Sequence, residues 1–171
     1  EHLHDAVDAI ASWLESKDGK LFELDNSSAR ILALWDVLCE LMSDPAGAEE
    51  RGYHDIMTAV LNDAPGVLVE VLISQIELNE RKVALREELL PRFQRAIEWH
   101  RERGAIAQCA LLQRVPWLET MFSDWIHLQL VPLLTTDDQY KLDRWQARFY
   151  QTHPGSMKLF ASTKKAFFET F

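Results

Sequence analysis

The chain has 171 residues, of which 47% are hydrophobic and 26% charged, a composition typical of globular proteins that argues against disorder. Its formal net charge of −9 argues against nucleic acid or an anionic membrane as the main partner, because both are bound through clustered Lys and Arg. No apolar run approaches the ~20 residues of a membrane span and no signal peptide is visible, so we expect a cytoplasmic protein.

In chain order, the first three helices are marked by apolar residues at helical spacing. The first is expected over residues 3–14 and ends at Asp18-Gly19. A second follows the capping sequence Asn26-Ser27-Ser28, carries apolar residues from Ile31 to Met42, and is broken at Asp44-Pro45. A short third helix is expected over residues 53–61.

The stretch Ala59–Glu77 is expected to be the centre of the fold. After Pro65-Gly66, which suits a first helical turn, the residues are apolar on most sides of a helix, with Glu70 as one of few polar breaks. Such a helix must be covered by neighbours on two or more sides. The other helices are therefore expected to pack around it.

The later helices are separated by glycine, proline and capping residues. The charged stretch Asn79–Glu88 is either a loop or a continuation of the central helix, and a fifth helix is expected over residues 89–100 with Pro91 near its start. Gly104 is expected to separate it from a short helix over residues 106–112. Further helices are expected at residues 116–132, from the cap at residues 136–138 through Phe149, and after a Ser156 cap to Phe171.

These elements predict an all-α fold, because no segment alternates with the period of a strand. Eight or nine short antiparallel helices with tight connections suggest an irregular α-solenoid of the HEAT or TPR kind, and a compact orthogonal bundle is the alternative. Most of the six Trp residues are expected in the core. The two cysteines, Cys39 and Cys109, are expected to be buried free thiols, with one disulfide as the alternative.

The sequence has no initiator Met and stops at Phe171 inside an amphipathic run. We therefore expect residues 1–171 to form a single helical domain that is a fragment of a larger protein. The last helix carries a wide apolar stripe, and a terminal solenoid repeat would normally have a polar outer face. We expect the stripe to be an interaction surface, covered by the next helix of a longer chain or by a second copy; its residues are Phe160, Phe167, Phe168 and Phe171, together with Met157.

One pattern in the sequence is similar to a catalytic motif. Helical nucleases of the HEPN type use an Arg that is followed by a His after four to six intervening residues. Arg95 with His100 fits it, and so does Arg148 with His153. A chain with 11 Arg and 6 His contains about one such pair by chance, so two pairs are no enrichment. A HEPN-like ribonuclease is therefore kept only as the alternative function.

No other group of residues in the sequence predicts a catalytic, metal-binding or cofactor-binding site. His2 and His4 lack further ligands that would complete a metal site, and His127 lies on an apolar helix. Glu70 and Glu119 have no second acid placed by the sequence to make a catalytic pair. Glycine-rich phosphate loops and nucleophile elbows are absent. We therefore expect no enzyme activity, no catalytic or metal residues and no cofactor.

Three stretches resemble the helical C-terminal region of large bacterial anti-phage defence proteins, whose N-terminal part is a SIR2-like NADase or a STAND-type NTPase. They are residues 10–15 with Leu34–Leu38, residues 59–72, and Trp125 with residues 130–134 and 145–149. The resemblance implies a non-catalytic scaffold that senses a phage component or transmits that sensing to an effector domain. The expected partners are other domains of the same chain, a phage protein or a second copy; a purely structural oligomerisation segment is the further alternative.

Overall fold

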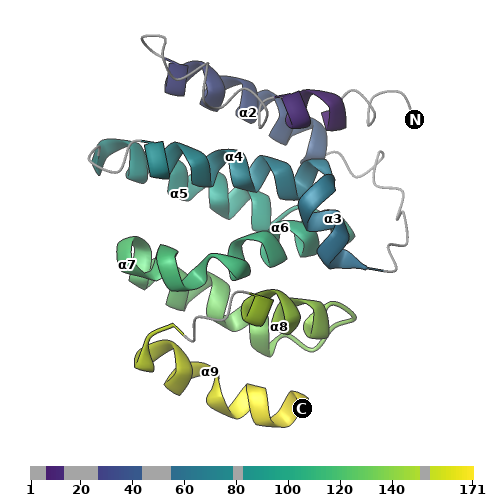
Figure 1. Cartoon of the computed structure of the whole chain (residues 1–171), viewed down its shortest axis with the longest axis vertical. Coiled ribbons are helices and arrows are strands. Elements are labelled where there is room, and N and C mark those ends of the chain that lie inside the picture. The colour runs from purple at the N-terminus through teal and green to yellow at the C-terminus, as the bar shows by residue number, and fades with distance from the viewer. Residues whose placement is uncertain (1–6, 14–26, 44–54, 79–82, 151–154) are drawn as a thin grey trace. The chain divides into compact units, whose positions relative to one another are not determined.

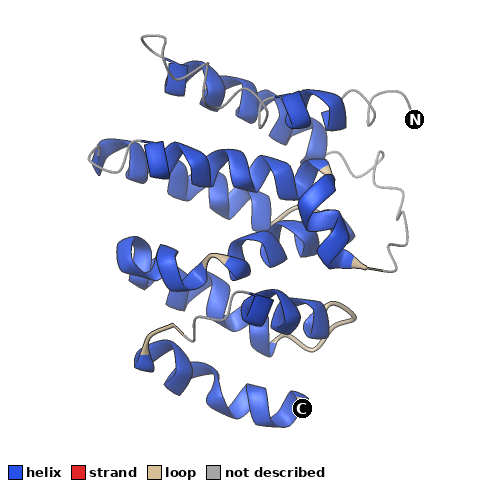
Figure 2. Ribbon diagram, viewed as in Figure 1, coloured by secondary structure: helices blue, strands red, loops and turns tan. Residues whose placement is uncertain are grey.

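The computed structural model describes residues 7–13, 27–43, 55–78, 83–150 and 155–171, and all statements of structure concern these residues. They fall in two compact units, Glu1–Ala107 and Gln108–Phe171, with the boundary inside one helix. Their regular secondary structure is helical throughout, with no strand among them (Figure 2). The prediction of an all-α fold is therefore confirmed.

The first unit is built around helix α4 (Ala64–Leu78), which was predicted to be the centre of the whole fold (Figure 1). Helices α2 (Ser27–Ser43), α3 (Ile56–Asn62) and α5 (Val83–Ile97) all pack against it. Eleven of its 15 residues are buried, and Leu72 is completely inaccessible. A helix this apolar is stable in water only because three neighbours cover it.

Two contacts tie α4 to its neighbours. The indole of Trp35 on α2 donates a hydrogen bond of 2.9 Å to the Leu68 carbonyl on α4. At the other junction, a Cβ on Gly66 would lie 2.0 Å from the Val60 carbonyl oxygen of α3. Any side chain at position 66 would therefore force the α3–α4 bend apart.

Helix α2 is joined to α5 by charges at its surface. The carboxylate of Asp36 accepts hydrogen bonds from Arg92, at 2.6 Å and 3.1 Å, and from Arg95 at 3.0 Å. Arg95 also pairs with Glu40 at 2.6 Å. Arg92 and Arg95 of α5 are therefore both paired with carboxylates of α2.

The fifth helix was placed wrongly from the sequence. It begins at Val83, so Pro91 lies in its interior and not near its start. Part of the ambiguous stretch Asn79–Glu88 is therefore the first turn and a half of α5, while residues 79–82 lie outside the described part. Pro91 is exposed, so the amide hydrogen bond that it cannot make is lost on the solvated side of the helix.

Gly104 was predicted to separate two helices, and this prediction is wrong. It lies in the first turn of α6 (Arg101–Gln113). A Cβ at this position would lie 2.2 Å from the Trp99 carbonyl oxygen. Arg101, with a positive φ of 52°, opens the helix at the same tight corner. Glycine is required here by the close approach of two backbone segments and not by a break.

In the second unit, one run of helix is kinked at Phe122 and then changes its helix type twice. It begins as α7 (Val115–Trp125), continues as the π-helical turn η2 (Ile126–Leu130) and ends as the 3₁₀ turn η3 (Val131–Thr135). Pro116 lies in the first turn of α7, as predicted. Pro132 lies inside η3, so it does not close the run, which continues to Thr135.

Helix α8 (Lys141–Tyr150) is held through a buried arginine that the sequence did not indicate. The Arg144 side chain is 2% exposed; it pairs with Asp138 at 2.7 Å and also donates to the Thr136 carbonyl at 3.1 Å. Asp138 also accepts a hydrogen bond of 2.9 Å from the amide of Tyr140, in the turn that precedes α8.

Helix α9 (Met157–Thr170) ends the described chain and packs against η3. Its predicted cap is confirmed, because the Ser156 hydroxyl accepts a hydrogen bond of 3.1 Å from the Leu159 amide. Elsewhere, Trp35, Trp99 and Trp145 are buried as expected, whereas Trp13 is 47% exposed. Cys39 and Cys109 are both free and buried, which confirms that prediction.

No single helix in the described ranges is long and apolar enough to cross a membrane. The bent pair α3 and α4, which meet at 56°, passes that test on length and composition together.

Candidate interaction surface

Helix α9 has two faces of opposite character. Its inward face consists of Leu159, Thr163 and Ala166, all buried. These side chains are small or medium in size, so the helix axis can lie close to the rest of the unit. The sequence predicts one apolar stripe on this helix, whereas the structure separates this packing face from the larger residues beside it.

The large apolar side chains of α9 face mainly outward. The exposed fractions are 80% for Met157, 47% for Phe160, 66% for Phe168 and 68% for Phe171. These residues follow a spacing of three, eight and three, so they share one side of the helix. We call them, together with Lys164, the outer stripe.

Of the four phenylalanines predicted as interaction residues, Phe167 differs from the others. It is half-buried, and its ring meets Trp145 edge to face at 5.6 Å. The same Trp145 stacks on Phe149 at 5.7 Å and meets Phe171 at 6.4 Å. Phe167 therefore belongs to an aromatic cluster that supports the outer stripe from beneath, and only Phe160, Phe168 and Phe171 remain as surface residues.

The first turn of α9 is fixed by a carboxylate that is only slightly exposed to solvent. Glu119 on α7 accepts hydrogen bonds from the Ser156 hydroxyl at 2.6 Å and from the Ser156 amide at 3.3 Å. His127, in the π-helical turn, lies 3.0 Å from the same carboxylate. The side chains of Glu119 and His127 are only 9% and 16% exposed. Glu119 thereby ties the start of α9 to two other elements of its unit.

The ionisation of Glu119 is favoured by this setting. Burial raises the pKa of the carboxyl group, but the hydrogen bonds from Ser156 and His127 outweigh burial and hold the pKa below its ordinary value. Nearby, burial lowers the pKa of Arg148 and the charge of Glu119 acts against that lowering. The Arg148 guanidinium lies 5.8 Å from the centre of the Phe149 ring. His127 and Glu119 are thus hydrogen-bond partners of each other within the second unit.

The charge balance differs between the two units, and α9 carries a net positive charge. Residues 1–107 hold 21 acidic and 11 basic residues, whereas residues 108–171 hold 6 and 7. Helix α9 alone carries Lys158, Lys164 and Lys165 against Glu169. Lys165 pairs with Glu169 at 3.6 Å and Lys158 donates to Ser123 at 3.4 Å. Within the described part of the chain, Lys164 has no ion-pair or hydrogen-bond partner.

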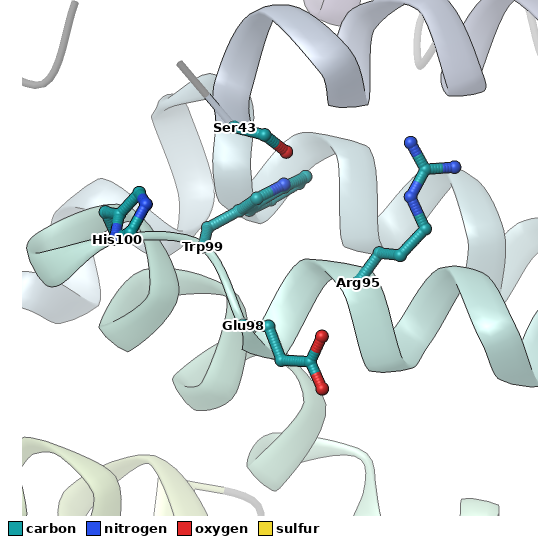
Figure 3. A pocket seen from close by; sticks show the side chains of 5 residues that line it. All are labelled: Ser43, Arg95, Glu98, Trp99 and His100. Atoms are coloured by element: carbon teal, nitrogen blue, oxygen red, sulfur yellow. The ribbon is translucent and has the colours of Figure 1, made fainter. Parts of the chain in front are cut away.

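A small open pocket of about 180 Å³ lies in the first unit (Figure 3). It is lined by Ser43 at the end of α2, Arg95 on α5, and the turn residues Glu98, Trp99 and His100. This volume is below the roughly 300–1,000 Å³ of typical small-molecule sites. Trp99 is almost fully buried, and it stacks on Trp35 with ring centres 6.2 Å apart, so it has no free face for a ligand to stack on.

The first candidate nuclease pair lines this pocket but lacks the expected geometry. Helix α5 ends at Ile97, so His100 lies in the turn after the helix that carries Arg95. In Figure 3 the Trp99 side chain lies between them. The Arg95 guanidinium binds Asp36 and Glu40 and lies 5.7 Å from the Trp35 ring centre. Its charge is therefore already neutralised by two carboxylates.

The remaining candidates do not form a site. Arg148 is buried in α8 and its proposed partner His153 lies outside the described residues, as do His2 and His4. Glu70 is half-buried on α4. In the part of the chain that the structure describes, no three His, Cys, Asp or Glu side chains are grouped as metal ligands.

The chain was compared with known proteins at three levels. It matches no protein-family model, no curated protein and no solved structure.

Proposed function

We propose that this chain is a non-catalytic helical interaction module that docks another polypeptide on the outer stripe of α9. The observation that carries the proposal is the separation of the two faces of α9. Leu159, Thr163 and Ala166 form the packing face and are buried against the rest of the unit. Three larger apolar side chains, Phe160, Phe168 and Phe171, are exposed to solvent. Exposed apolar groups of this size are characteristic of interaction sites.

The contacts that hold α9 in one orientation support the same proposal. The helix is capped by Ser156, tied to α7 through Glu119, and supported from below by Trp145 and Phe167. A docking face held in one orientation loses less conformational entropy on binding than a loose one. This agrees with the sensor or scaffold role in a bacterial anti-phage defence protein that the sequence resemblance implies, which remains part of the proposal.

Site-specific photocrosslinking tests the proposal. A benzophenone side chain is placed at Phe168 in the full chain, inside cells that make the protein, and at Ser162 as a control. Ser162 is an exposed residue of the same helix outside the outer stripe. We expect crosslinks to a protein from position 168 and few from position 162. Equal labelling from both positions, or none from position 168, would contradict the proposal.

A further inference from the structure

The outer stripe has a sequence symmetry centred on its one charged residue. Met157 and Phe171 each lie seven residues from Lys164, and Phe160 and Phe168 each lie four residues from it. Spacings of four and seven bring side chains back to the same side of a helix. Lys164 is thus in the middle of the apolar stripe and not at its edge.

This position weighs against a second copy as the occupant. An antiparallel pair of α9 helices with full overlap has its two-fold axis at residue 164, so each Lys164 would face the other. A parallel pair in register places the same two lysines together. Like charges brought together in a partly dry interface repel strongly. Sliding one helix to separate the lysines leaves at least one of the apolar side chains beyond the end of the partner's stripe.

A carboxylate opposite Lys164 would avoid the repulsion between two lysines and would neutralise the charge within the apolar stripe. The lysine has no partner in the described chain, and four apolar side chains surround it along the helix, so an acid facing it would form a pair shielded from water. Charged pairs of this kind contribute mainly to the choice of partner, as polar residues do within apolar helix seams. The outer stripe therefore demands both apolar contacts and one negative charge at its centre.

We propose that the occupant of the outer stripe is an amphipathic helix of a different polypeptide, with apolar residues at both ends of its binding face and one Asp or Glu at the centre. This inference rests on the proposed function and specifies its partner by chemistry. The spacing of the stripe calls for apolar residues four and seven positions on each side of the acid.

Two synthetic helical peptides test the inference by fluorescence anisotropy with the full chain. Each has Leu four and seven positions on both sides of a central residue, on a neutral background, and they differ only in having Glu or Lys at the centre. We expect the Glu peptide to bind at least about tenfold more tightly than the Lys peptide, a difference of about 1.4 kcal/mol. Lys164→Glu is expected to reverse the preference.

Lys165→Glu is the matched control, because it makes the same charge change one residue away and outside the stripe. Its preference should stay with the Glu peptide. Equal reversal by both variants would show recognition of overall charge and would overturn the inference. Failure of both peptides to bind would also overturn it, as would binding of the stripe to anionic vesicles in place of the Glu peptide.

Sedimentation of the same samples distinguishes failure of the inference from failure of the proposed function. Self-association that Phe168→Glu abolishes would show that a second copy is the occupant. That result would overturn the inference and leave the docking function in place. Crosslinking at position 168 to a protein that lacks such a helix would have the same consequence.

Discussion

The hydroxyl of Ser156 donates a 2.6 Å hydrogen bond to the carboxylate of Glu119, which joins the N-terminus of α9 to α7. The same carboxylate lies 3.0 Å from His127 in the π-helical turn. Glu119 therefore fixes the start of α9 against α7 and the π-helical turn.

Glu119→Gln should lower the free energy of unfolding by about 1–3 kcal/mol at pH 7, because it removes charged hydrogen bonds in a buried setting. The effect has a pH dependence of known sign. The pKa of Glu119 is held below its ordinary value of 4.5, so its contribution is present above that value and is lost as the pH falls through the lower, folded-state pKa. Urea unfolding from pH 7 to pH 3 should show the wild type and the variant converging.

Asp124→Asn is the control for this experiment, since Asp124 is an exposed acid of the same helix. It should change stability by less than about 0.5 kcal/mol. A gap between wild type and Glu119→Gln that stays constant across the pH range would show that Glu119 acts through packing and not through its charge.

Leu72→Ala should cost roughly 2–5 kcal/mol, as for other fully buried leucines. Leu78→Ala, on the same helix at a residue that is 51% exposed, should cost far less. Equilibrium denaturation of both variants makes the comparison. A loss below about 1 kcal/mol for Leu72→Ala would mean that α4 is not the core of its unit.

Gly104→Ala should destabilise the chain even though alanine is the better helix former by about 1 kcal/mol. The added Cβ would meet the Trp99 carbonyl oxygen at 2.2 Å, and overpacking of this kind typically costs about 1–3 kcal/mol. Thermal unfolding measures the sign directly. An increase in melting temperature would show that the corner between α5 and α6 can open at little cost.

Helices marked by local sequence signals were predicted correctly, and those that depend on tertiary contacts were not. The continuous apolar run after Pro65 predicted α4 and its burial, and the Ser156 cap predicted the start of α9, because both signals are local. The role of Gly104 is not visible in the sequence, because it depends on the Trp99 carbonyl, which only the fold brings near. The start of α5 at Val83 could not be predicted from the sequence. The residues before Leu89 are mostly charged, and a solvated first turn has few apolar residues to show helical spacing.

The candidate surface was predicted only in part. The sequence identified the aromatic residues of α9 but not that Phe167 faces inward to Trp145 while Phe168 faces solvent. That division depends on which side of α9 meets η3, a tertiary contact that the spacing along one helix does not specify. The buried Arg144 and its bond to Asp138 were missed for the same reason.

The purified chain should show no ribonuclease activity above that of an Arg95→Ala, His100→Ala double variant. Arg95 is bound to two carboxylates and His100 lies outside its helix. A labelled RNA substrate provides the assay. Because Arg95→Ala also removes ion pairs, the exposed His100→Ala is assayed alone, and cleavage that disappears in both variants would establish the nuclease function.

If the outer stripe is a docking surface and not part of the core, polar substitutions on it should hardly change the stability of the chain. The free energy of unfolding is therefore measured for a Met157→Gln, Phe160→Gln double variant and for Leu159→Ala in the same helix. We predict a change within about 0.5 kcal/mol for the double variant and a loss of about 2–5 kcal/mol for Leu159→Ala. A loss above about 2 kcal/mol in the double variant would contradict the account, because it would show that the outer stripe is buried within the folded chain.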